Sequence, residues 1–131
     1  MGKVKSSNII TTEERTMIRD YVLLNHMQVM AEKSIRDLKY SDNLLRQAFI
    51  MCGKIIEERI LQESKSLRLD LKDRGIVINK EEHADFVVYY HYTCRGYSER
   101  FGLTRDVMRA EIGIKFGKYI SEVGQILKAS K

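Results

Sequence analysis

The chain has 131 residues, which is enough for one domain with a single hydrophobic core and too few for two. Hydrophobic residues make up 44% of it and charged residues 31%, a balance that excludes a disordered chain. The net charge of +5 permits an acidic partner such as nucleic acid without requiring one. Because no run of 18 uncharged apolar residues occurs, we expect no membrane-spanning helix and no membrane partner.

The first ten residues show no periodicity, so we expect a flexible basic tail over 1–10 and a single helical domain over 11–131. The two cysteines, Cys52 and Cys94, form no CxxC motif, and the chain begins with no signal-peptide pattern. These features favour reduced thiols and a cytoplasmic location.

A first helix is expected from Thr11 to about Leu38. Thr11 and Glu14 have the spacing of a capping box, in which each side chain accepts a hydrogen bond from the other's backbone N–H. Apolar residues then recur every three or four positions, as a helix with one buried face requires.

A second, long helix is expected from about Asp42 to Arg74, with Ser41 as its N-cap and Gly75 in the left-handed position after its end. Its apolar face begins with Leu45, Ala48 and Phe49. At about 1.5 Å per residue, such a helix reaches on the order of 50 Å, more than a compact domain of this size needs. We therefore expect it to bend or to be covered by a second subunit, which predicts a homodimer.

The next segment has two interpretations. Asn79 and Glu82 have capping-box spacing, which indicates a helix from Lys80 to Arg95. The run from Phe86 to Thr93 is instead rich in strand-forming residues, and Ile76–Ile78 could be its hairpin partner. Residues 79–85 contain no Asn-Gly or Asp-Gly turn, which favours the helix.

A last helix is expected from Arg105 to Lys128, capped by Thr104. Its interior contains Gly113, Gly117 and Gly124, which we interpret as a smooth face that another helix approaches closely. The predicted fold is thus all-α, a four-helix-bundle-like domain with one long central helix. The alternative is an α+β fold with a hairpin at about 76–93.

Residues 84–101 hold six of the eleven aromatic residues. In a helix, neighbouring side chains diverge by about 100°, so these rings cannot all face one core. Tyr and Arg are favoured at interface centres. We therefore predict a partner-binding surface formed by Tyr89, Tyr90, Tyr92, Arg95 and Tyr97.

Catalytic and metal sites are not predicted. In the helical interpretation, His91 and Cys94 lie one turn apart, but the chain has no HExxH pattern and no recognisable further ligands. A nucleophilic Cys94 would also need an oxyanion donor, which no glycine-rich strand-to-helix turn supplies. We expect no catalytic residues, no metal and no cofactor.

The predicted function is that of a small, non-enzymatic regulatory or protein-interaction domain that binds a partner protein of unknown identity. The alternative is a DNA-binding transcriptional regulator. Its cations would come from the last helix, since residues 104–131 carry a charge of +3 and residues 76–103 carry −1. The cations predicted for that role are Arg105, Arg109, Lys115 and Lys118.

Overall fold

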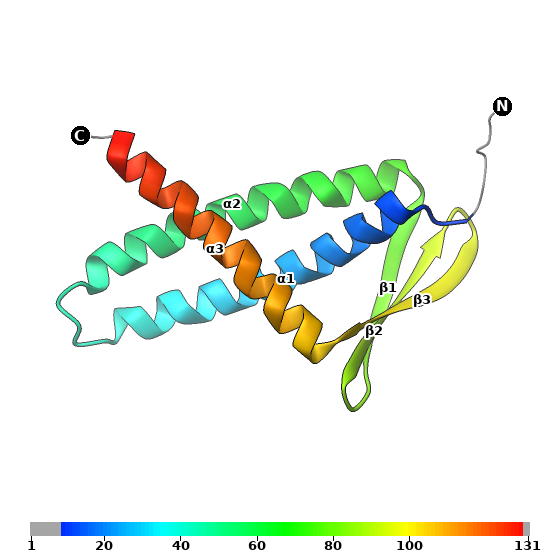
Figure 1. Cartoon of the computed structure of the whole chain (residues 1–131), viewed down its shortest axis with the longest axis horizontal. Helices are drawn as coiled ribbons and strands as arrows, with labels where there is room; N and C mark the ends of the chain where they lie inside the picture. The colour runs from blue at the N-terminus through cyan, green and yellow to red at the C-terminus, as the bar shows by residue number, and fades with distance from the viewer. Residues whose placement is uncertain (1–8, 130–131) are drawn as a thin grey trace.

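The computed structural model describes residues 9–129. Its elements are, in chain order, α1 (Thr12–Lys39), α2 (Arg46–Asp73), β1 (Ile76–His83), β2 (Val87–Cys94), β3 (Tyr97–Thr104) and α3 (Arg105–Ala129). Helices α1 and α2 form a long antiparallel hairpin, with the sheet at one end and the loop that joins the two helices at the other (Figure 1). Helix α3 crosses this hairpin obliquely.

The fold is α+β, so the prediction of an all-α helical bundle is wrong. Residues 80–83 and 87–94 belong to two strands instead of one helix, and the three strands form an antiparallel sheet in the order β1-β2-β3. The alternative hairpin is the one adopted, with Ile76 opposite Cys94 and His83 opposite Val88. The physical reason lies in β2, where buried and half-buried side chains alternate strictly, so that one face of the strand lies against the helices.

A two-residue turn at Arg95 and Gly96 joins β2 to β3. Both residues have positive φ angles, 49° and 89°, as a turn that matches the twist of a hairpin requires. An Arg-Gly pair is not among the usual signals for this turn. The sequence analysis therefore did not predict β3.

Both ends of α1 are close to the prediction. Thr11 Oγ1 accepts from the Glu14 N–H and a Glu14 carboxylate oxygen accepts from the Thr11 N–H, each at 3.1 Å, so the predicted capping box is confirmed. Of the predicted tail, residues 1–8 lie outside the described part of the chain, and Ile10 is buried in the core.

Helix α2 begins at Arg46, four residues later than predicted. Ser41 and Asn43 instead use their side chains within the loop, where they accept from the N–H groups of Asn43 and Leu45. Gly75 follows the helix with a φ of 73°, as predicted. At 28 residues α2 is about 42 Å long, and its N-terminal half extends far from the sheet.

Helix α3 follows β3 without a loop, and Thr104 caps it by accepting from the Val107 N–H at 3.2 Å. A Cβ atom at Gly113, Gly117 or Gly124 would meet nothing within 4 Å. No other helix of the described chain therefore approaches the glycine face of α3, contrary to the expectation of close packing.

The core has three clusters along α1. At the start of α1, Ile18 packs with Leu71 of α2 and Tyr92 of β2. In the next cluster, Val22 and Leu23 pack with Val88 and Tyr90 of β2. Further along α1, side chains from all three helices meet in a third cluster that includes Leu24, Met27, Ile60 and Tyr119.

A buried ion pair joins the sheet to the helical hairpin. The Arg95 guanidinium donates to both Glu14 oxygens at 3.0 Å, and the Glu14 side chain is only 5% exposed. Arg95 also donates to the carbonyl oxygens of Ile9 and Arg74. The Arg95 hydrogen bond is the main reason that the pKa of Glu14 falls from 4.5 to about 2, although burial opposes the shift.

We expect the free energy of unfolding to fall by about 3 kcal/mol as the pH drops from about 5 to about 2. The folded pKa of Glu14 lies below its unfolded value, so this contribution is complete above the unfolded value and is lost on protonation. Urea unfolding at several pH values measures it, and Glu14→Gln should remove this part of the pH dependence. Glu13→Gln is the control, because its side chain is 72% exposed and it should keep the wild-type profile.

Replacing either of two glycines by alanine should change the free energy of unfolding, in opposite directions at the two positions. At Gly102 a Cβ would lie 2.9 Å from the Tyr89 ring, so Gly102→Ala should lower the free energy of unfolding by about 1 kcal/mol or more. At Gly117 the space is open, and Gly117→Ala should raise it by about 1 kcal/mol through helix propensity. Chemical denaturation compares the two, and a stabilised Gly102→Ala would contradict the packing described for Tyr89.

Candidate functional site

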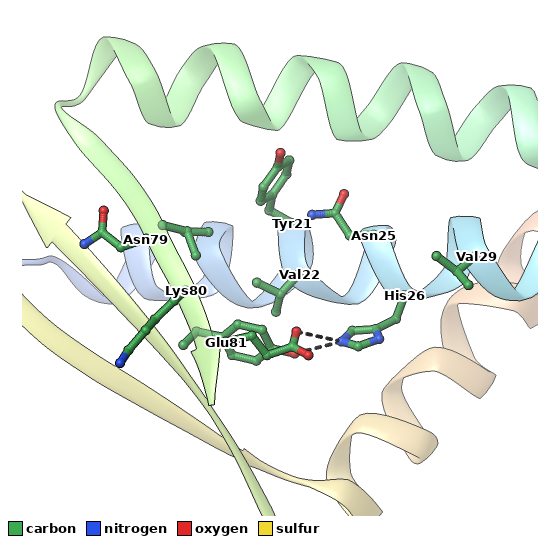
Figure 2. Close-up of a pocket in the computed structure, with 10 residues that line it drawn as sticks. Tyr21, Val22, Asn25, His26, Val29, Asn79, Lys80 and Glu81 are labelled. Atoms are coloured by element: carbon green, nitrogen blue, oxygen red, sulfur yellow. Dashed lines mark hydrogen bonds and ion pairs between the residues drawn. The ribbon is translucent and has the colours of Figure 1, made fainter. Parts of the chain in front are cut away.

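A cavity of about 410 Å³ forms an open cleft between α1 and the edge strand β1 (Figure 2). Its polar side chains come from both elements: Tyr21, Asn25 and His26 from α1, and Asn79, Lys80 and Glu81 from β1. Val22 and Ile78 add an apolar part to the lining.

A hydrogen-bond network runs beside this cleft. His26 Nε2 lies 2.8 Å from the Tyr90 hydroxyl and 3.4 Å from Glu81 Oε1, and Figure 2 shows both contacts converging on the His26 ring. The other Glu81 oxygen contacts His83 Nε2. Arg105 Nη2 then lies 3.2 Å from His83 Nδ1. The network thus joins α1, β2, β1 and α3.

The direction of these hydrogen bonds follows from the donor inventory. A guanidinium can only donate, so His83 Nδ1 must accept from Arg105. The ring proton of His83 is then on Nε2, which donates to the Glu81 carboxylate. Glu81 therefore accepts a hydrogen bond from His83 of its own strand, and its other oxygen lies 3.4 Å from His26 of α1.

The electrostatics of the network keep its hydrogen-bond donors and acceptors in fixed protonation states. Burial raises the pKa of Glu81, but the hydrogen bond from His83, with smaller contributions from His26 and Tyr90, outweighs this, so the net pKa is lowered. Burial, reinforced by the Glu81 charge, raises the pKa of Tyr90 far above its usual value. Tyr90 thus stays a protonated donor, and Glu81 stays an ionised acceptor.

The structure divides the five predicted partner-binding residues between the two faces of the sheet and its turn. Tyr90 and Tyr92, each 2% exposed, point from β2 into the core. Tyr89 lies on the opposite face, half-buried, with the Arg100 guanidinium 4.1 Å from its ring centroid. Tyr97 is 53% exposed, and Arg95 is held by Glu14. The five therefore form no single surface.

The four predicted nucleic-acid-binding residues are also not brought together. Arg109 and Lys118 are nine positions apart and therefore lie on roughly opposite sides of α3. Lys115 pairs with Asp20 at 3.3 Å and Arg109 with Asp106 at 3.5 Å, which partly neutralises both cations. Arg105 belongs to the network described above.

The sequence analysis missed the His26–Tyr90–Glu81–His83 network and the exposure of the hairpin end. The alternation of Glu81 and His83 would have been visible only if residues 76–83 had been read as a strand. Leu45 and Phe49 had been assigned to a buried helix face, but they are 60% and 45% exposed. An apolar pair at Leu44 and Leu45, just before the helix, was the available signal.

The described residues bear on two kinds of chemistry, a metal site and a reactive cysteine. Within residues 9–129 no group of three or more His, Cys, Asp or Glu side chains is placed to hold a metal ion. Both cysteines are free, and burial raises the pKa of the Cys94 thiol, which disfavours the reactive thiolate. None of the described helices is long and apolar enough to cross a membrane.

Replacing Tyr90 by Phe should lower the free energy of unfolding by about 1 kcal/mol, because the hydroxyl of the buried Tyr90 links His26 to Glu81. Urea denaturation measures this change. The matched control is Tyr97→Phe, whose side chain is half-exposed and should change stability by only a few tenths of a kcal/mol. Equal effects of the two substitutions would show that the network contributes nothing.

Comparison with known proteins returned one finding. No curated protein and no solved structure matches the chain. A family model described as YhjD protein matches residues 9–124, which include every strand, all of α1 and α2, and most of α3. Because this match covers most of the chain, the protein belongs to the YhjD protein family.

Proposed function

We propose that this protein is a non-enzymatic interaction domain that binds another protein chain through the loop end of its helical hairpin. The observation that supports this is the exposure of large apolar side chains there. Leu44 is 99% exposed, Tyr40 89% and Met51 66%, alongside Leu45 and Phe49. We call these five residues the hairpin-end surface.

Such a surface is costly to leave in water. Each Å² of apolar surface removed from water contributes about 25 cal/mol, so a partner that covers several of these large side chains gains free energy. An apolar cavity of about 280 Å³ lies along the same end of the hairpin, where Met30 and Leu38 of α1 face Ile56 of α2 and Phe116 of α3. A partner that covered the hairpin-end surface could extend into it.

The first partner we propose is a second copy of the chain, because the hairpin-end surface includes the N-terminal turns of α2, the helix whose length predicted a homodimer. Tyr89 and Arg100 on the outer sheet face remain available for a separate partner. The free thiols of Cys52 and Cys94 favour a reducing compartment, and we place this role in the cytosol.

Light scattering over a range of protein concentrations tests the self-association. The wild-type chain should form dimers, and a Leu45→Ser/Phe49→Ser double variant should be at least about tenfold weaker in dimerisation, because both side chains leave the interface. The control is Leu69→Ser, which removes a 47% exposed apolar side chain near the opposite end of α2. A wild-type chain that is monomeric at every concentration would rule out self-association through this surface.

The same light-scattering experiment also tests the alternative function, DNA binding. Adding duplex DNA at low salt should give no complex if the protein acts by protein contacts alone. A complex that weakens steeply as salt is added would instead favour phosphate recognition by the cations of α3, since such binding releases counterions.

A further inference from the structure

A second cavity, distinct from the hairpin-end surface, lies between α1 and the N-terminal half of α3. Its volume is about 280 Å³, near the lower limit of small-molecule pockets. Every titratable side chain in its lining is a base: His26, His83, Arg105 and Arg109. The rest of the lining is apolar and consists of Met30, Val88, Met108 and Ile112.

Arg105 gives this cavity an uncompensated positive charge. Its Nε donates to the Asp85 carbonyl at 3.4 Å and its Nη2 to His83 Nδ1 at 3.2 Å. Both acceptors are neutral, so no carboxylate in the described part of the chain meets the charge of Arg105. A guanidinium prefers two parallel hydrogen bonds to a carboxylate or phosphate, and this one has the capacity for further donation.

The nearby carboxylates do not lie in the cavity. Glu81 is engaged by His26 and His83 and lines the other cleft, on the β1 side of His26. Asp106 pairs with Arg109 at 3.5 Å and partly neutralises it, but Asp106 does not line the cavity. The lining therefore contains four basic side chains and no carboxylate.

The N-terminal end of α3 adds to this potential. The helix runs for 25 residues from Arg105, and the positive end of its dipole lies beside the cavity. The N–H groups of Arg105 and Val107 already donate to the Phe86 carbonyl and to Thr104 Oγ1. The dipole thus contributes through its field, and the direct donors are side chains.

We infer that this cavity binds a small organic anion with an apolar body, such as a short-chain carboxylate. The anionic group accepts hydrogen bonds from Arg105 and is attracted by Arg109, while the body packs on Met30 and Ile112. Met30 is 46% exposed and Ile112 is half-buried, whereas Val88 and Met108 are almost fully buried. A purely polar anion would leave the accessible surface of Met30 and Ile112 in water, and a purely apolar ligand would leave the charge of Arg105 unmatched.

Titration of the full chain with sodium hexanoate tests the assignment, with ¹³C-labelled methionine methyl groups as reporters. Met30 and Met108 line the cavity, so their resonances should shift and saturate. Met17 and Met51 lie elsewhere and should not shift. The compounds 1-hexanol and inorganic phosphate each carry half of the proposed chemistry, and each should bind at least about tenfold more weakly than hexanoate.

Charge-removing variants locate the anion. Arg105→Gln should weaken hexanoate binding about tenfold or more, because a charge-assisted hydrogen bond is lost. Arg109→Gln, at an 80% exposed side chain, should weaken it about threefold. Lys118→Gln removes the same charge from α3 outside the cavity and should leave the affinity unchanged. Circular dichroism confirms that each variant is folded.

Several results would overturn the assignment. These are no saturable shift of Met30 and Met108 with hexanoate, equal binding of 1-hexanol or of phosphate, and a Lys118→Gln effect as large as that of Arg105→Gln. Unchanged affinity in Arg109→Gln would also overturn it if Arg105→Gln failed to fold. Met30 also lines the apolar cavity at the hairpin end, but Met108 does not, so the Met108 resonance distinguishes failure here from failure of the proposed self-association.

Discussion

The ion pair between Arg95 and Glu14 connects three segments that are far apart in the sequence. Glu14 belongs to the first turn of α1 and is positioned by its capping box with Thr11. Arg95 lies in the β2–β3 turn, and it also donates to the Arg74 carbonyl at the end of α2. The positive φ of Arg95 costs about 1–2 kcal/mol for a residue with a side chain, which the ion pair and its hydrogen bonds offset. This contact therefore holds the sheet against one end of the helical hairpin.

The position of the sheet determines where the candidate sites form. With the inner face of β2 packed on α1, Glu81 of β1 and Tyr90 of β2 come within hydrogen-bond distance of His26. Because α3 continues β3 without a loop, the same placement brings Arg105 to His83. The two cavities on either side of His26 are thus consequences of how the sheet docks, since their linings come from elements that only the sheet brings together.

The path of α3 explains why apolar side chains at the loop end of the hairpin are exposed to solvent. This helix starts at the sheet and crosses α1 and α2 obliquely near their middle, where Tyr119 and Phe116 join the core (Figure 1). A helix running along the hairpin would have covered Leu45 and Phe49, but the crossing leaves them in solvent. The apolar surface of the hairpin end and the charged cavity near the sheet therefore lie in different parts of the molecule and can serve different ligands.

The sequence by itself determined the features that depend on neighbouring residues. The Thr11–Glu14 capping box, Gly75 after α2 and the Thr104 cap of α3 were all predicted, because each rests on contacts within a few residues. Only the tertiary structure decided between helix and strand at residues 76–104. Local signals there conflicted, and burial of alternate β2 side chains against α1 resolved the conflict in favour of the sheet. The His26–Glu81 contact and the cationic cavity at Arg105 also depend on distant elements docking together, so no local pattern could have predicted them.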